Sequence, residues 1–317
     1  MSLRAWSAFA AMAFLWGIPY LFIKVAVDDG VPPIFVAWAR IVMAAAVLLA
    51  LAWRAGTLPT VRGRARWLLA FAIAEIAIPF PLIAIGEVYV DSSLAAIVIA
   101  TVPLVVAVLA VGFAPSERVD GSRLAGLVIG FAGVVALVGL DLTGSAAELL
   151  GALAIFGAAV GYAIGPMLLR AKLGDLDPRA TMGVSLALAG IVLTPFAAVD
   201  LPTQGPSGEA WLSIAVLGLF CTAVAFVVYS GLVVEVGAGR AVVITYVAPV
   251  VAIALGVAVL GERPGPGAVA GLLLILAGSW LSTDGRVPPG LAAIVTRRRS
   301  RRKPGAATAG SVRESAT

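Results

Sequence analysis

Long apolar stretches recur ten times along the chain, separated by short polar segments. A helix needs about 20 apolar residues to cross about 30 Å of hydrocarbon, and each stretch is close to that length. The stretches are continuously apolar, whereas the strands of a membrane barrel alternate between apolar and polar positions. The pattern predicts an all-α polytopic membrane protein with ten transmembrane helices, at residues 5–26, 33–53, 67–87, 93–113, 123–140, 148–169, 179–199, 211–231, 239–260 and 267–283.

The composition supports this fold class. Of 317 residues, 61% are apolar and 12% are charged, whereas an ordinary soluble domain is about 45–50% apolar and about 25% charged. A water-soluble globule cannot hide such an apolar excess, since its surface needs polar cover. The composition therefore argues against a soluble enzyme, a disordered chain and a fibrous protein.

Several kinds of reactive chemistry have no residues to support them. The chain contains no histidine and one cysteine, Cys221. A disulfide framework, a Cys/His zinc site and a catalytic triad with histidine all need residues that are missing. No glycine-rich phosphate-binding loop with a lysine is present, so ATP is not expected to supply energy. We expect no cofactor, no metal site and no enzymatic activity, and we interpret Cys221 as an inert small apolar residue.

Loop charges predict the orientation in the membrane. The loops after spans three, five and seven contain acids and no Lys or Arg, whereas the loops after spans two and six are basic: Arg54, Arg62, Arg64, Arg66, Arg170, Lys172 and Arg179. Basic loops stay in the cytoplasm, so both termini are expected there, and Arg263 on the outer side is an exception. Six of the 22 basic residues lie between Arg297 and Lys303. A basic cluster after a last span indicates an anchor or a contact to anionic lipid rather than nucleic-acid binding.

The two halves of the chain resemble each other. Matching positions lie 145 or 146 residues apart, as Pro103 and Pro249 or Glu117 and Glu262 do. Five spans in each half is an odd number, so the second copy must enter the membrane upside down. Inverted repeats are typical of secondary transporters, whose site lies near the midplane where the repeats meet. We therefore predict two inverted five-helix repeats, at 1–141 and 142–283, and a basic, disordered cytoplasmic tail at 284–317.

Glycines recur every four residues in three spans. Gly157, Gly161 and Gly165 do so in span six, and shorter pairs stand in spans five and ten. This spacing places small residues on one helix face and lets helix backbones approach each other. We interpret these glycines as packing positions. Those of spans five and ten could face a second copy in a homodimer or pack within one chain.

The chain resembles the drug/metabolite transporter superfamily, in particular its ten-span EamA-type members, over residues 5–283. The resemblance rests on Phe14–Pro19 followed by Lys24, on Pro33–Arg40, on the Pro103 and Pro249 regions, and on Leu260–Pro264. The first half departs from the pattern at Ala114–Glu117. The resemblance implies secondary transport of small metabolites, often export of amino acids or related compounds, without fixing the substrate.

Ionisable residues inside spans are costly and need a reason. Glu75 lies near the centre of span three, one turn before Pro79 and Pro81, where the helix should bend and free carbonyl groups. It is a candidate site for a coupling proton or cation, or for a cationic group of the substrate. The alternative is a fixed ion pair with Arg40 or Lys24.

Arg40 lies inside span two. Its guanidinium group matches a carboxylate or phosphate bidentately, so it is a candidate for binding such a group. The alternative is that Arg40 locks span two to its neighbours, and the resemblance favours this general role. Lys24, near the outer end of span one, is interpreted as an interfacial residue.

Aromatic and hydroxyl side chains complete the candidate site. Trp16 and Tyr162 match in the repeat and lie deep in their spans, so we expect them beside a central cavity. Tyr20 and Tyr246 are further candidates for binding or coupling. Thr101, Thr222 and Thr245 are weaker ones, because helical threonines commonly bond to the preceding turn.

These observations predict a secondary transporter in the inner or plasma membrane. It would move a small organic metabolite by alternating access, as an efflux system coupled to a proton or another ion. One alternative is an integral-membrane enzyme acting on lipids or peptides, although such enzymes cluster His, Asp or Cys near the membrane surface. The other is a non-transporting membrane scaffold.

Overall fold

The computed structural model describes residues 3–113, 121–141, 145–236 and 244–282. All regular structure within these ranges is helical, and no strand occurs in them. The expected tail at 284–317 lies outside the described residues. The longer helices are α1 (Leu3–Gly17), α2 (Pro19–Asp28), α3 (Pro33–Arg54), α4 (Ala65–Ala72), α5 (Pro79–Gly86), α6 (Ser92–Ile99), α7 (Val102–Phe113), α8 (Gly121–Asp141), α9 (Ala146–Leu168), α10 (Pro178–Val199), α11 (Gly208–Gly218), α12 (Ala225–Val236), α14 (Ile244–Val259) and α15 (Pro266–Ser282).

Each of the ten predicted spans coincides with a helical segment. Six described segments are long and apolar enough to cross a membrane. Spans four, five, nine and ten correspond to shorter apolar helical segments, at Ser92–Val106, Leu124–Ala136, Val247–Val259 and Pro266–Leu281. The prediction of an all-α polytopic membrane protein is confirmed.

Within the described residues, several spans are not single regular helices. Span one divides into α1 and α2 at Ile18, just before Pro19, and span four divides into α6 and α7 just before Pro103. Proline lacks the N–H that a helix interior needs, so the helix is interrupted at these points. Spans three and eight each contain a π-helix instead, η2 (Ile73–Ala77) and η4 (Leu219–Val224).

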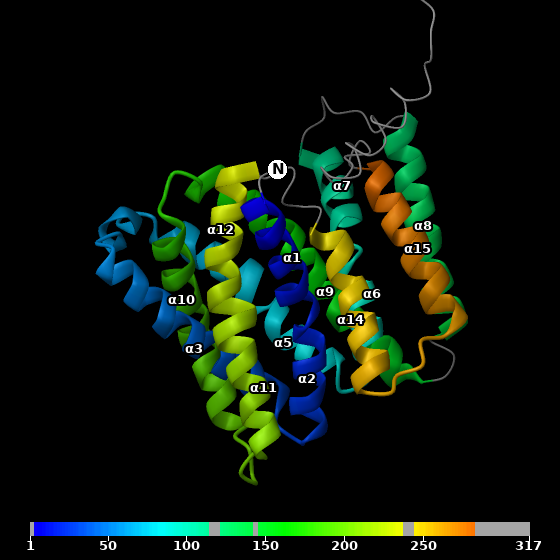
Figure 1. The fold of residues 1–317 in the computed structure, drawn as a ribbon, viewed down its shortest axis with the longest axis horizontal. Coiled ribbons are helices and arrows are strands. Elements are labelled where there is room, and N and C mark those ends of the chain that lie inside the picture. The colour runs from blue at the N-terminus through cyan, green and yellow to red at the C-terminus, as the bar shows by residue number, and fades with distance from the viewer. Residues whose placement is uncertain (1–2, 114–120, 142–144, 237–243, 283–317) are drawn as a thin grey trace, which may run out of the picture.

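The packing of spans follows the predicted repeat. Matching spans pack on each other, as α3 packs on α10, α6 on α14, and α8 on α15. Two further close pairs, α5 with α9 and α2 with α11, are related to each other by the same exchange of halves. Two copies related by a two-fold axis produce this arrangement. In Figure 1, α8 and α15 stand side by side at the right-hand edge of the bundle.

Glycines allow these close contacts. A side chain at Gly278 of α15 would collide with the backbone of Gly126 and Gly130 on α8. The glycines of spans five and ten therefore pack within one chain. On α9, Gly161 lies against the Ala74 carbonyl and Gly165 against the Glu75 side chain, so α9 touches the middle of span three.

The two ends of the bundle differ in charge. The N-terminus and the loops at residues 55–64 and 174–177 lie at one end, which we call the basic end (Figure 1, top). There Arg64 pairs with Asp175, at 2.8 Å between Nη2 and Oδ2, and joins the two halves. At the other end, the acidic end, lie the loops that contain Asp29, Glu87, Asp91, Ser207 and Glu262.

Candidate functional site

Arg40 is buried inside the bundle without a carboxylate partner. Its side chain lies on α3, two turns after the Pro33 that begins the helix, and is 6% exposed. Nη2 donates to the Thr222 hydroxyl oxygen at 3.1 Å, and the guanidinium carbon lies 4.3 Å from the centre of the Phe80 ring. Nε has no hydrogen-bond partner. Within the described ranges, Arg40 is thus fixed in position by Thr222 and Phe80, but no carboxylate pairs with its positive charge.

Thr222 positions this guanidinium group. It lies in the π-helix η4, and its hydroxyl donates to the Leu217 carbonyl at 2.8 Å while accepting from Arg40. A π-helix widens the turn and often marks a functional position. Thr222 is only a weak candidate in the sequence, because many helical threonines make a local bond of this kind.

Glu75 is an acid without a cationic partner on the neighbouring span. It lies in the π-helix η2. The predicted irregularity before Pro79 occurs here, because the Ile78 N–H donates to the Ile73 carbonyl five residues earlier. Its Oε2 atom is buried without a hydrogen-bond partner. Its carboxylate lies against Gly165 of α9, at a position where a Cβ atom would not fit.

The structure does not form the ion pair considered as the alternative for Glu75. Arg40 bonds to Thr222. Lys24 pairs with Asp28, at 2.9 Å between Nζ and Oδ1, and also donates to the Glu87 backbone carbonyl at 3.0 Å. Lys24 is therefore engaged with two neighbours rather than simply interfacial. Buried Arg40 and half-buried Glu75 therefore both remain without an ion-pair partner.

Tyr162 lies near both Arg40 and Glu75. It packs against two hydrophobic clusters, one around α2, α6 and α11 and the other around α3, α4 and α10. It is close enough to interact electrostatically with both Glu75 and Arg40. Tyr20 is buried and interacts electrostatically with Tyr162 and Arg40. Four of the predicted site residues are thus brought together in the middle of the bundle.

The other predicted residues are placed differently. Trp16 belongs to a third cluster and packs on Tyr229, with ring centres 4.9 Å apart. Tyr229 in turn interacts electrostatically with Glu75, so Tyr229 connects Trp16 to Glu75. The Thr101 hydroxyl, in the turn between α6 and α7, donates to the Val98 carbonyl of α6 at 2.6 Å. The side chain of Tyr246 lies outside the described residues.

Glu87 ends predicted span three and is not among the candidate site residues that the sequence indicates. Its side chain is 0% exposed, and neither carboxylate oxygen has a hydrogen-bond partner. One signal was present, because Glu87 directly follows the apolar run of span three with no polar residue between them.

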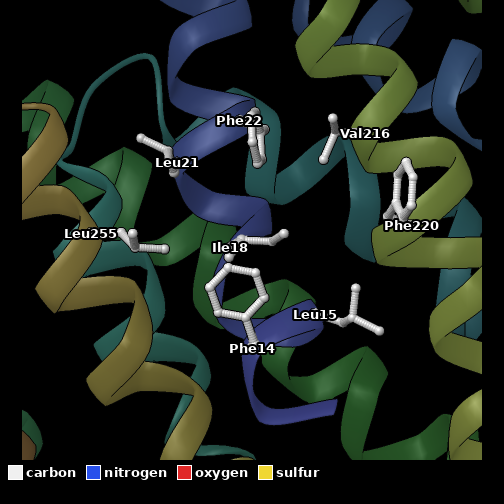
Figure 2. A pocket seen from close by; sticks show the side chains of 8 residues that line it. All are labelled: Phe14, Leu15, Ile18, Leu21, Phe22, Val216, Phe220 and Leu255. Atoms are coloured by element: carbon white, nitrogen blue, oxygen red, sulfur yellow. The ribbon is translucent and has the colours of Figure 1, made fainter. Parts of the chain in front are cut away.

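Figure 2 shows the residues that line a pocket, whose volume is about 350 Å³. Its lining comes from α1, α2, α11, η4 and α14, near the middle of their spans, and every lining residue is apolar: Phe14, Leu15, Ile18, Leu21, Phe22, Val216, Phe220 and Leu255. A pocket without a polar or charged side chain offers no partner for a charged group. We therefore place the candidate site at Arg40 and Glu75.

Comparison with known proteins identifies the family. The model of the EamA-like transporter family matches residues 4–139 and again residues 149–283. An uncharacterized transporter of Archaeoglobus fulgidus is 28% identical over 286 residues, which are 88% of this chain and 98% of that protein. The uncharacterized inner membrane transporter YedA of Escherichia coli is 30% identical over 272 residues, 82% of this chain and 84% of YedA.

Two further similarities are partial or concern the fold alone. Protein PagO of Salmonella typhimurium is 35% identical over 135 residues, which span only 42% of this chain and 43% of PagO. A solved crystal structure superposes with a TM-score of 0.62 at 20% identity, over 94% of this chain and 99% of that one, and shows the same fold. With the family model matching both halves of the chain, this protein is a membrane transporter that belongs to the EamA-like transporter family.

Proposed function

We propose that this transporter exports small zwitterionic metabolites, amino acids or related compounds, by alternating access and in exchange for protons. The observation that supports it is the pair of uncompensated charges in the middle of the bundle. Arg40 lacks a carboxylate, Glu75 lacks a cation, and Tyr162 interacts with both. A zwitterion has the two charges that this arrangement needs.

Each end of the substrate would meet a matching group. Arginine binds a carboxylate through parallel hydrogen bonds, and Nε of Arg40 has no hydrogen-bond partner of its own. Glu75 would accept the substrate's ammonium group, and the rings of Tyr162 and Tyr229 near it suit a cation. Uncompensated buried charges are costly, so substrate binding would relieve that cost at both positions.

The same carboxylate would explain exchange with protons. Glu75 can hold either the substrate's ammonium group or a proton, but not both. When the site opens to one side, a proton would replace the substrate, and when it opens to the other side, substrate would replace the proton. The halves of an inverted repeat rock around such a fixed site in known secondary transporters.

Thermal unfolding of the purified protein tests the substrate class. Amino acids, amines, nucleosides and sugars are compared at two pH values, and each hit is compared with analogues that lack its carboxylate or its amine. We expect stabilisation by zwitterions, because a ligand at about 100 times its Kd adds about 2.7 kcal/mol to the folded state. Stabilisation by sugars or nucleosides alone would contradict the proposal.

Two variants separate the roles of the charges. Glu75→Gln should abolish the contribution of the ligand's amine to the stabilisation. Arg40→Lys should weaken the contribution of the ligand's carboxylate. The matched controls are Glu209→Gln and Arg62→Lys, which change exposed residues in the same way. In reconstituted vesicles, Glu75→Gln should also remove the pH dependence of transport. If both variants bind zwitterions as the parent does, the proposed site is wrong.

We also propose that the basic end faces the cytoplasm of a cell with this protein in its inner or plasma membrane. Basic loops are retained on that side. With Cys221 replaced by alanine, a cysteine can be placed at exposed Thr60 of the basic end or exposed Thr203 of the acidic end. An impermeant thiol reagent on intact cells should label only the Thr203→Cys protein. A homodimer stays a prediction, and the mechanism does not need one.

A further inference from the structure

Glu87 is the most completely enclosed acid among the described residues. Its side chain is 0% exposed, and both carboxylate oxygens lack hydrogen-bond partners. It follows α5, where its backbone N–H still donates to the Ile83 carbonyl at 2.9 Å. The backbone is held in place while the carboxyl group has nothing to bind. A carboxylate in this position needs either a bound cation or a proton.

The charges around Glu87 favour a proton. The titratable and charged groups that face it are Lys24, Asp28 and Tyr20 on α2, Arg40 on α3, and Glu262 after α14. The two cations and the two other acids balance each other, so ionised Glu87 would leave one negative charge in excess. In the described part of the chain no group of three or more acids or cysteines is arranged to hold a metal ion.

Glu87 lies where the two halves of the protein close the acidic end. Glu262 of the second half accepts hydrogen bonds from Ser92 N at 2.8 Å and Ser93 N at 3.0 Å, and also from the Ser93 hydroxyl, at the start of α6 in the first half. In the opposite direction, Asp29 of the first half accepts from Ser207 N at 2.9 Å, just before α11. Opening this end requires these contacts to separate.

We propose that Glu87 binds a proton when the acidic end closes and releases it when that end opens, so that proton binding favours the closed end. The inference rests on the alternating access of the proposed function, and it adds a second proton site, separate from the substrate site at Glu75. The reaction is a simple exchange: the carboxylate takes one proton from solvent on closure and returns it on opening.

The direction of the effect follows from linkage. The closed end encloses Glu87 without a partner, whereas an open end exposes it to water, which solvates the ionised form. Lower pH therefore shifts the equilibrium towards closure, by at most about tenfold per pH unit for one proton. Gln at this position imitates the protonated acid and should keep the end closed at every pH.

Cysteine labelling of the full-length purified protein measures this equilibrium without any substrate. The reporter is Ala210→Cys on a Cys221→Ala background, because Ala210 lies on α11, is 0% exposed and packs in the same cluster as Ala26 and Val27 of α2. A hydrophilic maleimide reaches it only when the end opens. Since thiol reactivity itself changes with pH, each rate is divided by that of the exposed Thr203→Cys protein at the same pH.

We expect the relative labelling rate to fall several-fold as the pH is lowered from about 8 to about 5.5, within the one-proton limit. Glu87→Gln should give a low rate at both pH values, and Glu209→Gln, an exposed acid at the same end, should behave as the parent does. A parent protein without pH dependence, or a Glu87→Gln protein that retains it, overturns the proposal.

Lys24→Met provides a second test that leaves Glu87 in place. Removing the nearest cation should move the midpoint of the labelling change to higher pH, because Lys24 favours the ionised form of Glu87. An unchanged midpoint would also contradict the proposal. Because no substrate is added, these results are independent of the zwitterion experiment, and either proposal can fail while the other holds.

Discussion

Span three and span eight stand at matching places in the two halves, and they share a geometry without sharing a chemistry. Their π-helices begin at Ile73 and Leu219, which lie 146 residues apart, the interval that also separates Pro103 from Pro249. In span three this widened turn presents Glu75, whereas the matching position in span eight is Cys221. The scaffold is repeated, but the charge is not.

The same asymmetry holds for the positive charge. Arg40 of span two matches Leu186 of span seven, which is fully buried and apolar. Arg40 and Glu75 therefore both come from the first half, and the second half contributes Thr222, Tyr162 and Tyr229 near them. A site with both charges duplicated would satisfy itself through internal ion pairs. The comparison suggests that asymmetry is what leaves Arg40 and Glu75 available to a substrate.

Restoring the missing charge should have the largest effect. Cys221 interacts electrostatically with Arg40, so Cys221→Glu should place a carboxylate beside the guanidinium group and neutralise it. A buried charge that loses its binding partner costs about 2–5 kcal/mol, so zwitterion binding should weaken by about 30-fold or more. Ligand-induced shifts in unfolding temperature measure this loss.

The control for this prediction is Cys221→Gln, which has the same size and no charge. It should retain much more of the binding than Cys221→Glu does. If the Cys221→Glu protein binds zwitterions as tightly as the Cys221→Gln protein does, then Arg40 does not bind the substrate's carboxylate. The difference between the two spans would then have no functional meaning.

The next effect concerns the helix that holds Glu75. Gly165→Ala would place a methyl group against the Glu75 carboxylate, so α9 and span three would have to move apart. Such overpacking costs about 1–3 kcal/mol, and we expect a lower unfolding temperature together with loss of binding. Gly157→Ala is the matched control, because its new methyl would meet only the end of the Leu82 side chain, at 3.2 Å.

A double variant isolates the contact with Glu75. Glu75→Ala removes the side chain that obstructs the new methyl group, so Gly165→Ala should cost much less stability in that background. Equal costs in both backgrounds would show that Gly165 is needed for another reason.

Thr222→Val tests the hydroxyl that span eight supplies to Arg40. The change removes an acceptor from Arg40 and a donor from the Leu217 carbonyl, and a buried polar group left unsatisfied costs about 1–3 kcal/mol. We expect a lower unfolding temperature, with Thr222→Ser close to the parent. Equal stability of the valine and serine proteins would mean that the hydrogen bond contributes nothing measurable.

The sequence predicted the repeated scaffold better than the site. Apolar runs of membrane-spanning length identify helices directly, and matched Pro and Gly positions indicate the repeat. The burial of Glu87 and the partner of Arg40 depend instead on which spans pack together, and no local pattern states that. Tyr229 shows the same limit, because it becomes relevant only through its contact with Trp16 and its proximity to Glu75. The domain boundaries at 141 and 283 stay predictions.

The smallest expected effect comes from the starts of spans two and seven. Here too, a charged residue in one span matches an apolar residue in the other. Both begin at a proline, but α3 has no side-chain cap, and the position that matches Asp177 is the buried Val31. Asp177 caps α10 by accepting from Arg179 N at 2.9 Å and Ala180 N at 3.3 Å. Its hydrogen bond with the Arg179 guanidinium, followed by the two backbone N–H groups, holds the pKa of Asp177 below its ordinary value.

Asp177→Ala should cost about 1 kcal/mol at neutral pH, as loss of an N-cap usually does. Because the pKa of Asp177 is lower in the folded protein than in the unfolded chain, its stabilising contribution is complete above about pH 4. That contribution is lost as the pH falls through the folded-state value. Asp177→Asn separates the two roles, since asparagine caps a helix as well as aspartate but does not titrate. Unfolding temperatures at about pH 7 and about pH 3 should therefore differ less for Asp177→Asn than for the parent, and an equal difference would mean that the Asp177 charge has no part in the cap.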